Sequence, residues 1–219
     1  MSSQPRAALL RDVAARLLAL PAHRPQRIAI DGVDGAGKTT FANELAAQLA
    51  PTGRAVIRAS VDGFHHPAAV RYRQGRRSPR GFFEDSYDYE ALERLLLHPL
   101  GPGGDRRYRT ACFDHRTDSA VEVAAQIAPN EALLLFDGIF LHRTRLRPFW
   151  DFSLFLDVPF DISIPRGAQR GEGYGAPDVR AASNHRYIVG QRLYLRYCQP
   201  KRHATLVIDN RDLAWPKLL

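Results

Sequence analysis

The residues best suited to chemistry lie in one short stretch, where Gly32, Gly37, Lys38 and Thr39 follow the spacing G-x-x-x-x-G-K-[ST]. Glycines permit backbone angles that other residues resist, so successive N–H groups can point at one anion, and a following helix adds its positive end. At this spacing, the lysine reaches the β- and γ-phosphates of a nucleoside triphosphate and the hydroxyl binds Mg²⁺. The motif therefore predicts a phosphate cradle made of Gly32, Val33, Asp34, Gly35, Ala36, Gly37, Lys38, Thr39 and Thr40.

The segments on either side agree with this interpretation. The apolar stretch 28–30 predicts a strand before the loop, and residues 40–50 predict a helix after it. An accidental glycine-rich turn would not need both neighbours. The loop predicts that a nucleoside triphosphate binds, but it does not specify what receives the phosphate.

Acidic residues follow two of the predicted strands. Asp62 comes directly after the predicted strand 55–60, and Asp137 after the apolar run 133–136. In an open parallel sheet, functional groups gather at the carboxyl ends of the strands. Asp62 is therefore a candidate for deprotonating an acceptor hydroxyl or for binding Mg²⁺ through water, and Asp137 for holding Mg²⁺ with Thr39. The plainer alternative for Asp62 is an aspartate that starts a turn.

A glycine-rich stretch late in the chain carries Arg166 and Arg170. This composition predicts a lid over approximately 163–180 that closes on the phosphates, with arginines stabilising the transferred charge. The alternative is a solvated loop.

Segments in the middle of the chain are candidates for binding the molecule that receives the phosphate, and we call this region the acceptor side. The polar stretch 67–83 predicts a long exposed loop, and segments 108–114 and 120–125 predict a hairpin within an inserted flap of approximately 106–126. Asp88 is interpreted equally as a helix N-cap or as a substrate contact. A metal site at His65–His66 is disfavoured, because adjacent histidines point apart and no third ligand is suitably spaced.

The length and composition argue against a membrane-spanning protein and a nucleic-acid-binding protein. The 219 residues suit a single domain, 1–219, with a net charge of +8 and no stretch long enough to span a membrane. Cys112 and Cys198 lack metal or redox spacing, so we expect reduced thiols in a cytoplasmic protein. Lysine occurs only three times among the 31 basic residues, which indicates an arginine bias and makes nucleic acid a disfavoured partner.

Taken together, these pieces resemble the uridine kinase-like group of phosphate-loop kinases, relatives of phosphoribulokinase and bacterial pantothenate kinase. Besides the glycine loop and the arginine lid, the resemblance is carried by Asp62-Gly-Phe64, Ser86-Tyr-Asp88, Phe113-Asp-His-Arg116, Phe136-Asp-Gly-Ile139, Pro200-Lys and Ile208-Asp-Asn210.

The resemblance implies roles for particular residues. Asp62 matches the general base, Arg166 and Arg170 resemble the lid arginines that act with Lys38 in catalysis, and Asn210 lies in the adenine-side loop. The cofactors implied are ATP, with GTP left open, and Mg²⁺ held by Thr39, Asp62 and Asp137. The acceptor contacts implied are Asp62, Phe64, His65, Asp88, His115 and Arg116.

We therefore expect a three-layer α/β/α domain with a mostly parallel five-stranded sheet, a small antiparallel flap and an arginine lid. The expected reaction moves the γ-phosphoryl group of ATP to a nucleoside hydroxyl, of the uridine or cytidine type. Phe64-His65 replaces the Phe-Tyr usual in uridine kinases, and Ala111-Cys-Phe-Asp114 departs from the Tyr-Asp-Phe usual before the flap histidine. These departures concern the acceptor more than the reaction. Pantothenate, a sugar phosphate or another small alcohol is the alternative acceptor, and a nucleotide-binding regulator or RNA-associated ATPase is the alternative class. A homo-oligomer is left open.

Overall fold

The centre of the fold is a sheet made from the apolar runs of the sequence. The structure is a computed structural model that describes residues 4–169, 171 and 175–219. Within these residues, six strands form the central sheet, and all neighbouring strands are parallel except the last pair. In spatial order the strands are β2 (Val56–Ser60), β7 (Leu133–Gly138), β1 (Gln26–Gly32), β8 (Phe152–Asp157), β9 (Leu206–Asp209) and β10 (Lys217–Leu218).

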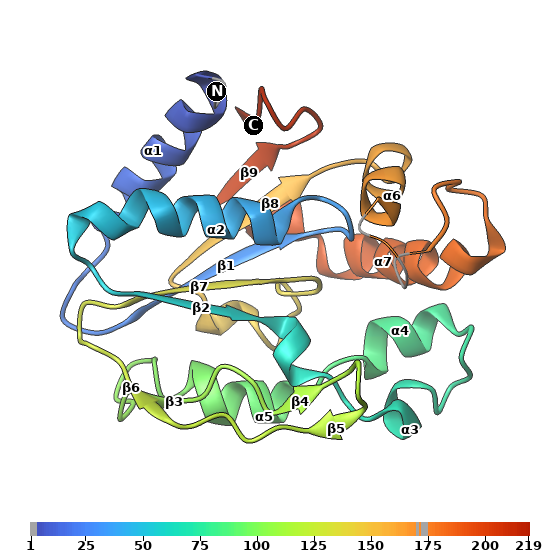
Figure 1. Ribbon diagram of the computed structural model, residues 1–219, viewed down its shortest axis with the longest axis horizontal. Coiled ribbons are helices and arrows are strands. Elements are labelled where there is room, and N and C mark those ends of the chain that lie inside the picture. Colours follow the sequence, from blue (N-terminus) through green and yellow to red (C-terminus); the bar gives the residue numbers. More distant parts are fainter. Residues whose placement is uncertain (1–3, 170, 172–174) are drawn as a thin grey trace.

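Side chains of the central strands alternate between two buried layers. Ile28, Ile30 and Leu135 face one layer, and Ala29 and Phe136 face the other. Helices α1 (Gln4–Leu18) and α2 (Lys38–Leu49) cover the first layer, whereas α5 (Tyr89–Leu92) and α7 (His185–Cys198) contribute to the second. Figure 1 shows the sheet with α1 and α2 above it and the flap strands below. The predicted three-layer, mostly parallel fold is therefore confirmed.

The sheet has one strand more than predicted. Strand β10 pairs antiparallel with β9, through Lys217 opposite Asp209 and Leu218 opposite Ile208. Two residues at a sheet edge carry no apolar alternation, so no sequence pattern marks them as a strand.

The predicted flap is present as two short antiparallel pairs instead of one hairpin. Strand β3 (Arg107–Tyr108) pairs with β6 (Gln126–Ile127), and β4 (Phe113–Asp114) pairs with β5 (Ser119–Ala120) inside it. The inner pair ends in a turn at residues 115–118, and this turn carries His115.

The prediction of a long loop over 67–83 was wrong, because two helices form there. These are α3 (Ala68–Arg71) and α4 (Pro79–Asp85). Ser78 caps α4 by accepting a hydrogen bond from the Gly81 N–H at 2.9 Å, and proline follows at the first helical position. Both are ordinary helix-start signals that the surrounding arginines and glycines obscure.

The remaining helical segments connect these layers. Residues 89–97 form α5 followed by a π-helical turn. No helix in the described part of the chain is long and apolar enough to cross a membrane. The other segments are α6 (Phe160–Ala168), α8 (Pro200–His203), the π-helical η3 (Glu93–Leu97), and the 3₁₀ turns η1 (Ala50–Thr52), η2 (Val61–Phe64), η4 (Arg147–Phe149) and η5 (Ala182–Asn184).

Candidate active site

The glycine loop joins β1 to α2 in the conformation that the motif predicts. Gly35 and Gly37 have φ of 74° and 91°, in the left-handed region that favours glycine. The Lys38 ammonium donates a hydrogen bond to the Val33 carbonyl at 2.9 Å, so the lysine folds back over the loop. The first N–H groups of a helix have no acceptor within the helix, so those at the start of α2 remain as donors for phosphate.

Other N–H groups of the loop are held by the protein itself. The amides of Gly32, Asp34 and Ala36 donate to the Asp31 carboxylate, the Gln191 side chain and the Val33 carbonyl, respectively. Fewer backbone N–H groups are therefore available for phosphate than the motif alone suggests, and the Asp34 amide is held from outside the loop by Gln191.

Oxygen ligands for Mg²⁺ meet at the carboxyl ends of β1 and β7. The Thr39 hydroxyl donates to an Asp137 carboxylate oxygen at 2.8 Å, and Asp137 is 2% exposed. A hydroxyl and a carboxylate side by side suit Mg²⁺, which prefers oxygen ligands and is completed by substrate phosphates and water. Thr39 and Asp137 therefore fit the ion, whereas Asp62 has no contact with either in the interactions described, and its metal role stays a prediction.

Arg58 is a site residue that the sequence reasoning missed. Its guanidinium pairs with Asp137 at 2.7 Å, on the oxygen that Thr39 leaves free, and it also contacts the Asn43 amide oxygen at 3.2 Å. An arginine between the apolar residues of a central strand indicates a nearby acid, and this signal could have found it. The pair fixes Asp137 in place and neutralises part of its charge.

Asp62 lies in the 3₁₀ turn η2, two residues beyond the end of β2, and is exposed. Its neighbour is Tyr87, whose hydroxyl lies 3.5 Å from a carboxylate oxygen of Asp62. Burial raises the pKa of Tyr87 well above its ordinary value, and the carboxylates of Asp62 and Asp34 add to this effect. Tyr87 therefore stays protonated and can donate to Asp62.

The segment around Tyr87 runs antiparallel beside the segment that carries Asp62. The His66 N–H donates to the Ser86 carbonyl at 3.0 Å, and the Asp88 N–H donates to the Phe64 carbonyl at 2.8 Å. This pairing explains how residues more than twenty positions apart in the sequence form one surface.

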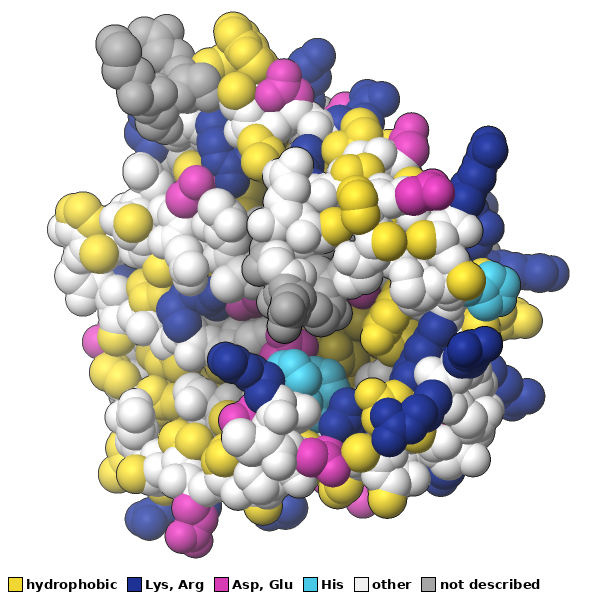
Figure 2. All heavy atoms as spheres, turned by 45° about the vertical axis from the view of Figure 1, so that its right-hand side comes forward, with side chains coloured by type: hydrophobic (Ala, Val, Ile, Leu, Met, Phe, Trp, Pro, Cys, Tyr) yellow, Lys and Arg dark blue, Asp and Glu magenta, His cyan; other side chains and the backbone are white. Residues whose placement is uncertain are grey.

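Two histidine rings lie in contact beside Asp62. The rings of His65 and His115 lie 4.4 Å apart between centroids, and the His65 ring lies 4.5 Å from that of Tyr87. The His65 Nδ1 bonds to the Asp62 carbonyl at 3.0 Å. His115 thus joins the flap to the site, and Figure 2 shows histidine side chains in a hollow between acidic and basic groups.

Asp118 fastens the same flap turn to α3. Its carboxylate accepts from the Ala68 N–H at 2.9 Å and from the Arg71 guanidinium at 2.7 Å. The flap is therefore held over the acceptor side by an ion pair as well as by the contact between the two histidine rings.

Replacing His65 with phenylalanine should change how stability depends on pH. Burial is the main cause that lowers the pKa of His65 to about 4 from an ordinary 6.5, and the positive charges of His115 and Arg71 lower it further. Below pH 6.5 the unfolded state binds a proton at His65 that the folded state excludes. The unfolding free energy therefore keeps its full value above pH 6.5 and decreases as the pH falls towards 4.

Between these pH values, the unfolding free energy of the wild type should fall more steeply than that of His65→Phe, by at most about 1.4 kcal/mol per pH unit. Urea unfolding at several pH values measures the difference. His23→Gln, at an exposed histidine, is the control and should keep the wild-type slope. Equal slopes for wild type and His65→Phe would contradict a half-buried His65 that stays neutral in the folded state.

Three residues predicted to contact the acceptor, Phe64, Asp88 and Arg116, lie in three different environments. Phe64 is 0% exposed and packs on Phe136, so its ring anchors the turn, and its role as an acceptor contact stays a prediction. Asp88 caps α5 by accepting from the Ala91 N–H at 2.9 Å, which is one of its two predicted roles. Arg116 is exposed on the flap turn, and its substrate role stays a prediction.

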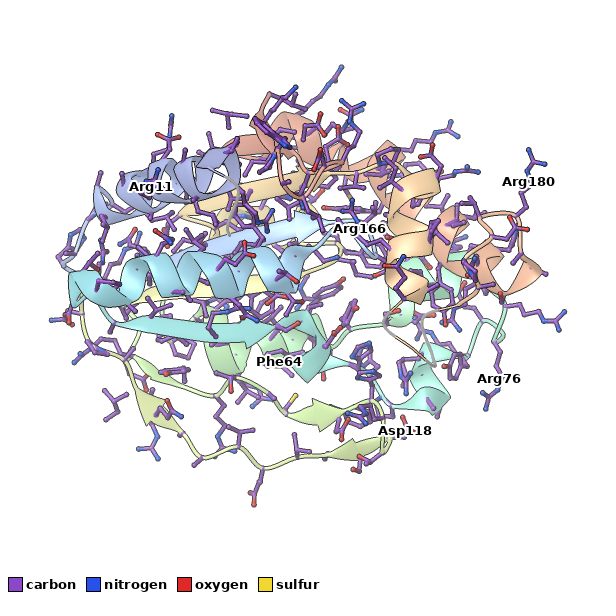
Figure 3. The ribbon with its side chains drawn as sticks, turned by 45° about the horizontal axis from the view of Figure 1, so that its top comes forward. Arg11, Phe64, Arg76, Asp118, Arg166 and Arg180 are labelled. Atoms are coloured by element: carbon purple, nitrogen blue, oxygen red, sulfur yellow. The ribbon has the colours of Figure 1, made fainter. Side chains whose placement is uncertain are left out.

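Arg166 lies in α6, and its guanidinium donates to the carbonyls of Asn210 and Arg211 at 3.2 and 2.7 Å. Figure 3 shows Arg166 well away from Asp118, which lies beside the flap strands. The contact of Arg166 with the transferred phosphoryl group stays a prediction. Arg170 lies outside the described residues.

Asn210 holds the glycine loop from the side of the C-terminal strands. Its side-chain amide donates to the Ala36 carbonyl at 2.8 Å, and its oxygen accepts from Arg6 at 3.3 Å. Asn210 is completely buried, so any effect on the nucleotide acts through the loop.

Comparison with known proteins identifies the class to which this fold and site belong. The chain belongs to the phosphoribulokinase / uridine kinase family, whose sequence model matches residues 27–210. It is therefore a member of a family of P-loop kinases, which use ATP with Mg²⁺.

Particular relatives differ in the acceptors that their names state. A uridine kinase from Leuconostoc citreum is 24% identical over 84% of this chain and 87% of its own length. A pantothenate kinase from Sinorhizobium medicae is 31% identical, but the match covers 61% of this chain and only 44% of the relative.

The names of similar solved structures also state different acceptors. A possible uridine kinase from Bacillus stearothermophilus has a TM-score of 0.71 at 24% identity, covering 92% of this chain and 97% of that one. A putative fructose transport system kinase from Silicibacter sp. TM1040 has a TM-score of 0.67 at 28% identity, covering 87% and 94%. The likeness below 25% identity shows the fold alone.

Proposed function

We propose that the protein transfers the γ-phosphoryl group of ATP to a hydroxyl of a nucleoside, of the uridine or cytidine type. The observation that carries this proposal is the exposed Asp62 carboxylate beside the clustered rings of His65, His115 and Tyr87. A carboxylate that can accept a hydroxyl proton next to flat aromatic faces suits a sugar hydroxyl carried by a flat base. The uridine kinase relative, which matches most of this chain, supports the same acceptor class.

Each residue of the site has a part in the proposed reaction. Asp62 accepts the hydroxyl proton as that oxygen attacks the γ-phosphorus, and ADP leaves with its bridging oxygen. The amides at the start of α2 and the Lys38 ammonium bind the phosphates. Thr39 and Asp137 would hold Mg²⁺, which would supply positive charge against the triphosphate. Arg166 and Arg170 are proposed to reach the transferred group when the lid closes.

A different acceptor is the second candidate. The pantothenate kinase relative is 31% identical, and the putative fructose transport system kinase has a similar fold, so pantothenate, a sugar phosphate or another small alcohol fits the same machinery. Acceptor-independent hydrolysis stimulated by RNA is what a nucleotide-binding regulator or RNA-associated ATPase would show instead.

A panel of acceptors tests the proposal. ADP formation from Mg·ATP is measured with uridine, cytidine, pantothenate, fructose, fructose phosphates and glycerate, and without any acceptor, with GTP as an alternative donor. We expect strong dependence on a pyrimidine nucleoside. Turnover that depends on another panel member would move the proposal to that acceptor, and turnover that ignores every acceptor would contradict a kinase.

A further inference from the structure

Helix α7 carries three buried polar side chains, each of which bonds to a different part of the site. Gln191 is 1% exposed, Tyr194 is 2% exposed and Arg186 is 9% exposed. Burying polar groups is unfavourable unless they find partners, so the partners indicate what the helix holds. In Figure 1, α7 lies at the end of the molecule towards which the parallel strands run.

Gln191 makes a reciprocal pair of hydrogen bonds with Asp34, inside the glycine loop. Its side-chain oxygen accepts from the Asp34 N–H at 2.6 Å, and its side-chain nitrogen donates to an Asp34 carboxylate oxygen at 3.1 Å. The same nitrogen donates to the Tyr187 carbonyl at 3.1 Å, one turn earlier in α7. The amide is therefore fixed on both sides, and so is the direction of the Asp34 peptide.

Tyr194 holds the beginning of the same loop. Its hydroxyl donates to the completely buried Asp31 carboxylate, which accepts from the Gly32 N–H at 2.7 Å and contacts the His142 Nδ1 at 2.6 Å. Residues 191 and 194 lie on one face of the helix, so one surface of α7 fixes two points of the loop.

Arg186 reaches the acceptor side. Its guanidinium donates to the Arg76 carbonyl at 2.7 Å, in the turn between α3 and α4, and its centre lies 4.8 Å from the Tyr72 ring centroid. Helix α7 thus fixes the glycine loop and also holds the turn between α3 and α4. This turn follows α3, the helix to which Asp118 of the flap is bonded.

We propose that Gln191 is a positioning residue of the nucleotide site, whose amide presets the Asp34 peptide and with it the phosphate cradle. The inference rests on the proposed function only in requiring that the loop bind a nucleotide. With the Asp34 N–H held by Gln191, the turn at Gly35 keeps one arrangement, and the free amides at the start of α2 meet the phosphates without reorganisation. Without Gln191, the loop must be ordered when the nucleotide binds, at a cost in affinity.

The reciprocal geometry allows a donor–acceptor exchange as the test. Gln191→Glu keeps an acceptor for the Asp34 N–H but places a carboxylate against the Asp34 carboxylate. Asp34→Asn supplies a donor in its place, so Asp34→Asn/Gln191→Glu restores one complementary pair. The expected result is that Gln191→Glu weakens Mg·ATP binding about 10- to 100-fold and raises the KM for ATP, with a smaller change in kcat. The double variant should bind at least about threefold more tightly than Gln191→Glu.

The binding constants are measured by titration of each full-length variant with Mg·ATP. Gln48→Glu, the same change at an exposed position of α2, is the matched control and should bind as the wild type does. If Gln191→Glu does not fold, Gln191→Met removes both hydrogen bonds without adding charge and should weaken binding in the same way.

Wild-type affinity in the folded Gln191 variant would overturn the positioning role alone, as would a double variant that binds no better than Gln191→Glu. A wild-type protein that binds no Mg·ATP would instead overturn the proposed function, and the Gln191 role with it.

Discussion

Replacing Asp62 with asparagine is expected to lower kcat by about two to four orders of magnitude. Asparagine keeps the shape of the side chain and a possible contact with Tyr87, but it cannot accept the hydroxyl proton. The turn itself should persist, because it depends on the Asp62 backbone, whose N–H donates to the Ser60 hydroxyl and whose carbonyl bonds to His65. The Kd for Mg·ATP should therefore change by less than about threefold.

Initial rates at saturating ATP and acceptor, together with direct titration of Mg·ATP, measure both quantities. Asp12→Asn is the matched control, because Asp12 is an exposed residue of α1 paired with Arg16 on the same helix. It should keep wild-type kinetics. Unchanged turnover in Asp62→Asn would remove Asp62 from the mechanism, whereas a parallel loss of ATP binding would point to a role in holding the nucleotide.

Replacing Gly35 with alanine is expected to weaken nucleotide binding severely. Gly35 has φ of 74°, where alanine is strained by about 1–2 kcal/mol. A Cβ atom there would also lie 1.9 Å from the Ser163 carbonyl oxygen on α6, a backbone atom that cannot rotate away. Either the loop or α6 must move, and both change the phosphate cradle. Affinity for Mg·ATP should fall by more than about 100-fold.

Gly53→Ala separates the close contact from the backbone strain. Gly53 has nearly the same φ, 76°, but nothing lies within 4 Å of its Cβ position. Both variants should lose unfolding free energy, with Gly35→Ala losing at least about 1 kcal/mol more, and Gly53→Ala should keep wild-type ATP affinity. Chemical denaturation and Mg·ATP titration decide this. Equal affinities in the two variants would show that α6 does not confine the loop.

The part of the fold that the sequence predicts well is the part coded locally. The β1–loop–α2 unit follows from fixed spacings of glycine, lysine and threonine, and β7 follows from an uninterrupted apolar run that ends in Asp137. Because both strands are parallel neighbours, their carboxyl ends meet, and the pairing of Thr39 with Asp137 agrees with that inference.

The contacts that complete the site are not coded locally. Gln191 and Asp34 are 157 positions apart, and Arg58 and Asp137 are 79 apart, so only the folded chain brings them together. Phe64 has the residue type of an aromatic substrate contact, but the 3₁₀ turn η2 directs it into the core while leaving Asp62 exposed. Spacing shows which residues lie near a site, and the turn geometry decides which of them face it.

The most direct test of phosphoryl transfer follows the label from [γ-³²P]ATP. Full-length protein is incubated with labelled Mg·ATP and uridine, cytidine or pantothenate, and the label is separated into phosphorylated acceptor and inorganic phosphate. The proposed mechanism predicts that the label enters a pyrimidine nucleoside, with one equivalent for each ADP formed, and that Asp62→Asn loses this transfer. Label that appears as inorganic phosphate at the same rate with and without every acceptor would contradict it.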